Sequence, residues 1–166
     1  MDVARVVWEL DQRRRITEVL QDYCTYVDRN DPGTLVRKVF APDATFELGS
    51  NRAVVGHENL ARMFAKTLAP FTATSHHLTN VRIAFDGDDH AHASASVYAW
   101  HCTAAGARAE VWGRYSDRLV LLEEGWRIEN RHISSAGADG WGDAPFQMIE
   151  RLPSPAELPS PVIERR

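Results

Sequence analysis

Apolar positions recur at helical spacing over the first part of the chain. Between Val6 and Val27 they fall at three- and four-residue steps, which predicts an amphipathic helix. The segment NDPG ends this pattern, and Asp31 followed by Pro32 is typical of the N-cap and first turn of a second, short helix over residues 34–40. The predicted apolar stripe of the first helix consists of Val6, Leu10, Ile16, Val19, Leu20, Tyr23 and Val27.

A third helix and a sheet are predicted farther along. Residues 56–71, GHENLARMFAKTLAPF, carry apolar side chains at helical spacing up to Pro70. Before them we expect a turn leading into a strand over 41–49 and a short extended piece over 53–56. From residue 74 to 135, β-branched and aromatic residues separated by the turn signals DGDD, AAGA and EEG predict four long antiparallel strands. This order of elements predicts an α+β fold with the helices on one face of the sheet.

The last thirty or so residues differ in composition from the rest. They contain the sequence PSP twice, which favours stiff, extended backbone. We therefore predict one domain over 1–136 and a Pro-rich tail over 137–166. Three apolar side chains indicate that the first half of this tail wraps over a neighbouring surface; they are Phe146, Met148 and Ile149.

Composition and charge narrow the function classes. The 166 residues are 44% hydrophobic and 25% charged, which is typical of one soluble globular domain. The net charge of -4 argues against a nucleic-acid partner. We find no apolar run long enough for a signal peptide or a membrane span. Cys24 and Cys102 are isolated, so we expect packing residues in a reducing, cytoplasmic setting, with no metal site and no cofactor motif.

Three residues could carry chemistry, and each also has a purely structural explanation. Tyr23 lies on the apolar stripe, where a core tyrosine is the simpler interpretation. Asp28 follows at the end of the same helix, where a capping or turn carboxylate is common. His101 ends a strand face of small residues, which indicates either a cavity lining or a close approach of the first helix.

The opposite face of that strand carries Tyr98 and Trp100. This face is too aromatic for full exposure to water, which indicates burial between subunits. We therefore expect a homo-oligomer.

The segment TSHHLTN (74–80) contains two adjacent histidines, of which only one can face a cavity because strand side chains alternate. Val81 and Ile83 define the apolar face farther along this strand. Counting back from them in steps of two residues places His77 on the same face, which favours His77 as the inward residue. A β-bulge near Asn80 would insert one residue and turn His76 inward instead.

Taken together, YCTYVDRND, FAPDATFE, TSHHLTN, GRYSDRL and GWRIENR resemble the SnoaL-like branch of the nuclear transport factor 2-like superfamily. The resemblance covers roughly residues 10–135. It implies a cone-shaped α+β barrel in which the N-terminal helices pack inside a strongly curved antiparallel or mixed sheet. The eliminating enzymes of this superfamily that the chain resembles are scytalone dehydratase, hexachlorocyclohexane dehydrochlorinase and bile acid 7α-dehydratase.

The resemblance assigns roles to particular residues. Asp28 falls on the family carboxylate and His76 on its catalytic base, which overrides the local preference for His77. Tyr23 matches a catalytic tyrosine, and His101 matches a second histidine expected to protonate or hold the leaving group. We expect Tyr115, Asn80, Val97 and Phe46 to bind substrate, and Arg131 is a further candidate pocket residue.

The implied function is a cofactor-independent lyase, a dehydratase acting on a small hydrophobic cyclic substrate. A double-bond isomerase would use the same base. Two other classes stay open, a non-catalytic ligand-binding module and a structural subunit resembling the β subunits of ring-hydroxylating dioxygenases. The eliminating enzymes with this fold are trimers, so a trimer is favoured over a dimer.

Overall fold

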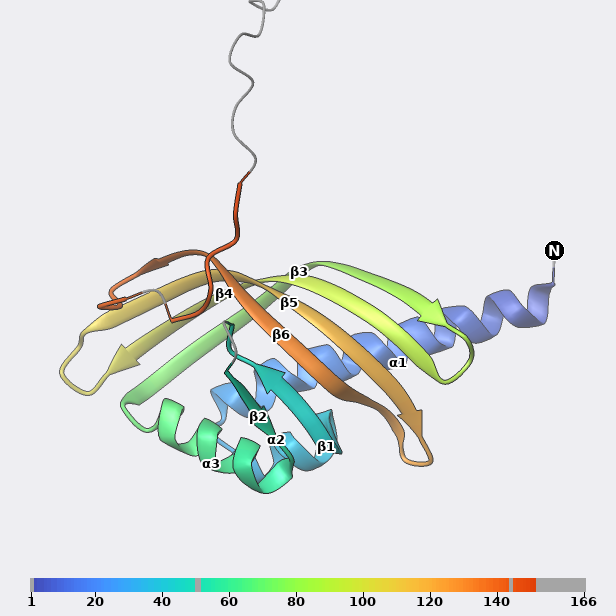
Figure 1. Ribbon diagram of the computed structural model, residues 1–166, viewed down its shortest axis with the longest axis horizontal. Helices are drawn as coiled ribbons and strands as arrows, with labels where there is room; N and C mark the ends of the chain where they lie inside the picture. Colours follow the sequence, from blue (N-terminus) through green and yellow to red (C-terminus); the bar gives the residue numbers. More distant parts are fainter. Residues whose placement is uncertain (1, 50–51, 144, 152–166) are drawn as a thin grey trace, which may run out of the picture.

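The protein is described here by a computed structural model that covers residues 2–49, 52–143 and 145–151. In these residues three helices lie on the concave side of one strongly curved, six-stranded sheet (Figure 1). The prediction of an α+β cone with the N-terminal helices inside a curved mixed sheet is confirmed.

All three predicted helices form, with small shifts at their ends. They are α1 (Val3–Asp28), α2 (Pro32–Val39) and α3 (His57–Leu68). The Asp31 side chain accepts a hydrogen bond from the backbone N–H of Thr34 at 3.0 Å, so the predicted N-cap of the second helix is present. Phe40, expected at the end of that helix, is already in extended conformation.

The strands are β1 (Phe40–Glu47), β2 (Ala53–Val55), β3 (Phe71–Asp86), β4 (His90–Thr103), β5 (Arg108–Leu122) and β6 (Gly125–Asp139), in the spatial order β2-β1-β6-β5-β4-β3. The four long strands form the predicted antiparallel meander, and β1 joins it by pairing with β6 in parallel.

One predicted boundary is wrong. The turn expected at the start of 41–49 is part of β1, whose register shifts between Phe40 and Thr45 instead of breaking. Strand β6 continues past residue 136 to Asp139, and the division into a domain and a Pro-rich tail stays a prediction.

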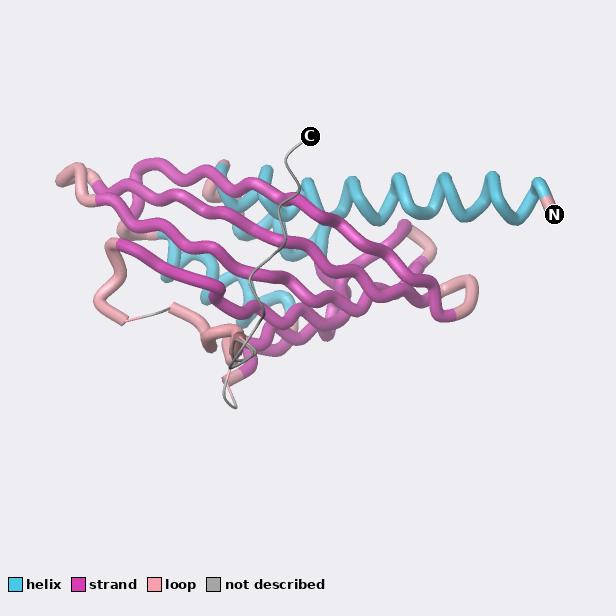
Figure 2. The backbone as a smooth tube through the Cα atoms, turned by 90° about the horizontal axis from the view of Figure 1, so that it is seen from above, coloured by secondary structure: helices cyan, strands magenta, loops and turns pink. Residues whose placement is uncertain are grey.

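The N-terminal end of α1 extends past the sheet (Figures 1 and 2). Val6 and Leu10 were expected in the buried stripe, but they are 42% and 63% exposed because another face of the helix meets β3, where the ring of Trp8 lies 5.4 Å from that of Phe85. Farther along, Ile16 and Leu20 are fully buried. Between the two halves, the buried Gln12 accepts a hydrogen bond from the indole N–H of Trp126 at 2.8 Å, which attaches α1 to β6.

The segment after β6 folds back over it. The backbone N–H of Ser135 donates to the carbonyl of Gln147 at 2.8 Å, and that of Ile149 donates to the carbonyl of Ser135 at 2.7 Å. Phe146 packs against the core as a result. The predicted wrapping of the first half of the tail is therefore present, and residues 152–166 lie outside the described part of the chain.

The outer face of the sheet carries a row of aromatic rings across three strands. The rings of His77 and Tyr98 are stacked at 5.9 Å, and Tyr98 lies 5.7 Å from Trp112, which is 43% exposed. This face matches the aromatic surface expected from the sequence, and the homo-oligomer stays a prediction.

A buried ion pair lies in the middle of the sheet. The guanidinium of Arg131 on β6 donates two hydrogen bonds of 2.7 Å to the carboxylate of Asp117 on β5. Their side chains are 0% and 1% exposed. Burial opposes the charge of Arg131, but Asp117 outweighs it and holds the Arg131 pKa above its ordinary value.

Removing one partner of this pair should be far more harmful than removing both. We expect Asp117→Asn to lower the free energy of unfolding by about 3–5 kcal/mol, because it leaves an uncompensated buried cation. The charge-free double variant Asp117→Leu/Arg131→Met should recover most of this loss. Urea unfolding monitored by circular dichroism measures both. Equal losses in the two variants would contradict the explanation.

Candidate functional site

The end of α1 is joined to β3 by the carboxylate of Asp28. This carboxylate accepts hydrogen bonds from Nδ1 of His76 at 2.7 Å, from the backbone N–H of His76 at 2.9 Å and from the hydroxyl of Thr74 at 2.8 Å. Because a carboxylate can only accept, the proton of a neutral His76 is on Nδ1 and the lone pair is on Nε2. The imidazole is thus held in one tautomer and one orientation.

A β-bulge decides which histidine of the pair faces inward. The register between β3 and β4 shifts between Thr79 and Arg82, and Asn80 has a positive φ of 55°. This irregularity reverses the alternation counted back from Val81. His76 consequently lies on the concave side, while His77 lies on the outer face against Tyr98.

The charge state of Asp28 follows from its contacts. Burial by itself would raise the pKa of this carboxyl group. The hydrogen bonds from the His76 ring and backbone, together with Thr74, outweigh burial and hold the pKa below its usual range. Asp28 is therefore an anion at neutral pH, placed to stabilise a positive charge on the imidazole.

Beside His76 the cone contains an apolar cavity of about 110 Å³. Its walls come from α1, α3, β1, β3–β6 and the segment after β6. Four predicted site residues besides His76 and His101 line it, namely Tyr23, Phe46, Val97 and Tyr115. The other lining residues are Val27, Leu48, Met63, Phe64, Thr67, Leu68, Phe71, Ala99, Val111, Ile133, Trp141 and Phe146.

His101 lies beside His76 at the cavity wall, on the adjacent strand β4. Its ring centroid is 5.4 Å from that of His76, and its Nδ1 lies 3.3 Å from the carbonyl oxygen of Ala109 on β5. Burial first, and then the neighbouring His76, lower the His101 pKa to about 4. The His101 imidazole is therefore uncharged at neutral pH, and its assignment to protonate or hold the leaving group stays a prediction.

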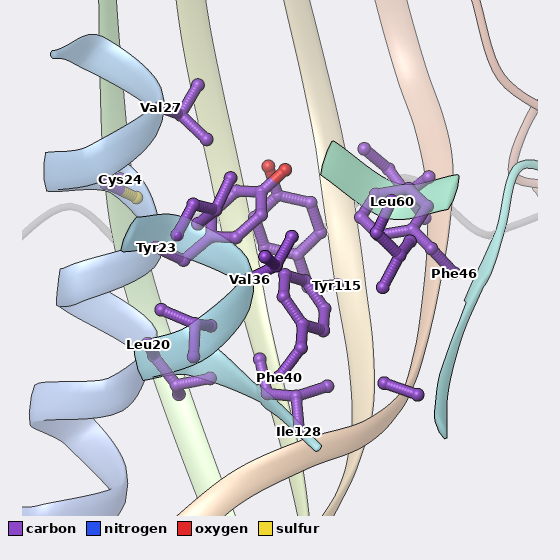
Figure 3. Close-up of a cluster of buried hydrophobic side chains, with 14 of the residues drawn as sticks. Leu20, Tyr23, Cys24, Val27, Val36, Phe40, Phe46, Leu60, Tyr115 and Ile128 are labelled. Atoms are coloured by element: carbon purple, nitrogen blue, oxygen red, sulfur yellow. The ribbon is translucent and has the colours of Figure 1, made fainter. Parts of the chain in front are cut away.

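Two tyrosines lie over the buried guanidinium at another side of the cavity. The Arg131 guanidinium is 4.1 Å from the ring centroid of Tyr23 and 4.1 Å from that of Tyr115. Figure 3 shows their hydroxyl groups pointing in the same direction. Burial raises the pKa of Tyr23 to about 12 and that of Tyr115 well above its ordinary value, so both hydroxyls keep their protons and can donate.

The remaining predicted residues lie outside the cavity. Asn80 is exposed at the bulge, where it shapes the strand. Arg131 is covered by the two tyrosines. Cys24 is buried, and burial raises the pKa of its thiol to about 11, in keeping with a packing residue. In the described residues we find no group of side chains that could hold a metal ion and no helix long and apolar enough to cross a membrane.

Several residues of the site were not predicted from the sequence. Thr74 could have been found, because it lies two positions before His76 and so shares its strand face. Phe71 and Trp141, which contact the His101 ring, gave no such signal. Trp141 reaches the cavity only because the chain turns back after β6, and no local pattern encodes that contact.

Comparison with known proteins identifies the family. A model of the SnoaL-like domain matches residues 8–132. The chain therefore belongs to the SnoaL-like domain family, whose fold is that of the nuclear transport factor 2-like superfamily. No curated protein sequence matches the chain.

Several solved structures share this fold. A protein of Novosphingobium aromaticivorans DSM 12444 provisionally named scytalone dehydratase has 22% sequence identity and a TM-score of 0.83, over 89% of this chain and 99% of that one. A provisionally named aromatic ring hydroxylase from Novosphingobium aromaticivorans has 27% identity and a TM-score of 0.70, over 75% and 88%. Hexachlorocyclohexane dehydrochlorinase LinA-type3 from Novosphingobium barchaimii LL02 has 16% identity and a TM-score of 0.71, over 89% and 98%.

The contacts of Asp28 predict a pH-dependent contribution to stability. Its folded pKa lies below that of the unfolded chain, so the contribution is present above the unfolded value of about 3.9 and is lost as the pH falls through the folded value. We expect Asp28→Asn to cost about 1–3 kcal/mol at neutral pH, which is typical of charged hydrogen bonds. Urea unfolding of the wild type and of Asp28→Asn should show that the difference between their free energies of unfolding becomes smaller at about pH 3 and below. The same difference in unfolding free energy at neutral pH and at low pH would contradict the assignment of a lowered pKa to Asp28.

Proposed function

We propose that this protein is a cofactor-independent lyase that removes water from a small hydrophobic cyclic substrate. The observation that carries the proposal is the His76–Asp28 contact of 2.7 Å at the wall of an apolar cavity. A neutral imidazole with one fixed tautomer is suited to take a proton from carbon near neutral pH. The resemblance to proteins named for dehydration and dehydrochlorination supports elimination as the reaction class.

The proposed elimination begins at a carbon atom next to a carbonyl group. Nε2 of His76 takes the proton, and the C–H electron pair moves toward the carbonyl, forming an enolate. The anion of Asp28 stabilises the imidazolium that results, as the carboxylate of a catalytic triad does. The hydroxyls of Tyr23 and Tyr115 are suited to donate to the carbonyl oxygen as its charge grows.

In the second half of the reaction the enolate electrons form the carbon–carbon double bond and expel the hydroxyl group. The imidazolium of His76 returns its proton to the departing oxygen, so that water leaves and the base is neutral again. One proton is taken and one is returned, which needs no further acid. This route agrees with a neutral His101.

A double-bond isomerase is the second candidate. It would use the same transfer by His76 but return the proton to another carbon. The two tyrosine donors favour this candidate equally, because a dienolate oxygen needs the same stabilisation. Mass spectrometry of the product separates the two reactions, since only the dehydratase loses water.

Replacing the base gives the direct test, with its neighbour as the matched control. His76→Ala should lower turnover by about 10²–10⁴-fold or more, because it removes the general base. His77→Ala changes an adjacent histidine on the outer face and should leave turnover near that of the wild type. The assay follows new ultraviolet absorbance in a panel of cyclic β-hydroxyketones.

Circular dichroism spectra and unfolding midpoints would show that both variants are folded. Near-normal turnover in His76→Ala, or equal losses in the two variants, would refute the proposed base.

A further inference from the structure

The hydrogen bond of His101 fixes the position of its proton. Nδ1 lies 3.3 Å from the carbonyl oxygen of Ala109, which is the residue paired with His101 on the adjacent strand. A carbonyl oxygen only accepts, so Nδ1 carries the hydrogen and Nε2 carries the lone pair. Nε2 is therefore an acceptor at the tip of a ring that lines the cavity.

The packing around His101 keeps the ring in this orientation. Its centroid lies 4.7 Å from that of Phe71 and 5.3 Å from that of Trp141, and the residue is only 6% exposed. A flipped ring would give up the Ala109 contact inside a tightly packed site. The contact with a carbonyl group at 3.3 Å is weaker than the 2.7 Å contact of His76 with a carboxylate, so the packing of Phe71 and Trp141 supplies part of the restraint on the His101 ring.

The combined effect of burial and of the charged and titratable groups around His101 also favours its neutral form. His76 faces it from β3, and Asp28 lies behind His76 at the end of α1. Burial and His76 lower the His101 pKa, while the Ala109 carbonyl and Asp28 oppose the shift without overcoming it. At neutral pH the His101 imidazole is therefore an acceptor at one end of the cavity, and the tyrosine hydroxyls supply donors elsewhere.

We infer that His101 is a specificity-determining residue that selects substrates bearing an O–H or N–H group directed at its Nε2. A ligand without such a donor would leave a desolvated acceptor unpaired, which is how polar sites reject close analogues. The inference rests on the proposed function in taking this cavity as the substrate site, and it adds the class: a hydroxylated or amino-substituted single ring.

The size of the cavity agrees with one ring. Its volume of about 110 Å³ is smaller than an apolar cavity of about 150 Å³ that holds benzene in another protein, so the cavity has room for one ring at most. Phenol and toluene are therefore suitable probes, because they share the ring and differ in one group, a hydroxyl in place of a methyl.

The test compares affinities for the two probes in the full-length protein. Wild type should bind phenol in preference to toluene, and His101→Phe, which keeps a flat ring, should lower this preference by about fivefold. His77→Phe, on the outer face, is the matched control and should leave the preference unchanged. Ligand-observed NMR titration gives the dissociation constants.

A second readout reports on the atom itself. In protein labelled with ¹⁵N-histidine, the His101 signals, assigned by their absence in His101→Phe, should show the Nδ1–H tautomer at neutral pH. Phenol should shift the Nε2 resonance in the direction expected for a newly accepted hydrogen bond, and toluene should not.

Three results would overturn the inference. They are an unchanged phenol preference in His101→Phe, a phenol preference that disappears in His76→Ala alone, and failure of both probes to bind. These outcomes are independent of turnover. If phenol is selected through His101 but the His76→Ala variant turns over substrate normally, the inference is upheld and the proposed lyase is refuted.

Discussion

The carboxylate of Asp28 both attaches helix α1 to the sheet and orients the imidazole of His76. It closes the C-terminal end of α1 onto the edge strand β3 through three hydrogen bonds, to Thr74 and to the backbone and ring of His76. The same contacts fix the tautomer of the imidazole at the cavity wall. Any change that moves the end of α1 therefore moves the His76 imidazole, so the helix packing that buries Ile16 and Leu20 also positions the site.

The cavity is polarised although its walls are mainly apolar. The His101 imidazole presents an acceptor, and two tyrosines present donors over a guanidinium whose charge is balanced by Asp117. Asp28 lies behind His76 and outside the cavity lining. No Asp, Glu, Lys or Arg side chain is among the described residues that line the cavity, so the site favours neutral molecules.

Local patterns in the sequence predicted most of the elements, since helical periodicity and strand alternation are short-range properties. They failed where tertiary context decides. Val6 and Leu10 continue the apolar periodicity of α1, yet they stay exposed because the helix meets β3 through the face that carries Trp8. Alternation alone pointed to His77, and only family resemblance supplied the bulge that turns His76 inward. The contact of Trp141 with the cavity depends on a chain reversal that has no sequence signature.

The bulge at Asn80 has a consequence for how such a protein can evolve. Side chains along a strand point alternately to the two faces of the sheet. One inserted residue therefore exchanges the faces for every position on that side of the bulge. A single-codon insertion or deletion in this segment would exchange a buried imidazole for a surface one without altering the codon of either histidine. In a lineage with this fold, activity could then be lost or regained by indels while the histidines themselves are still encoded.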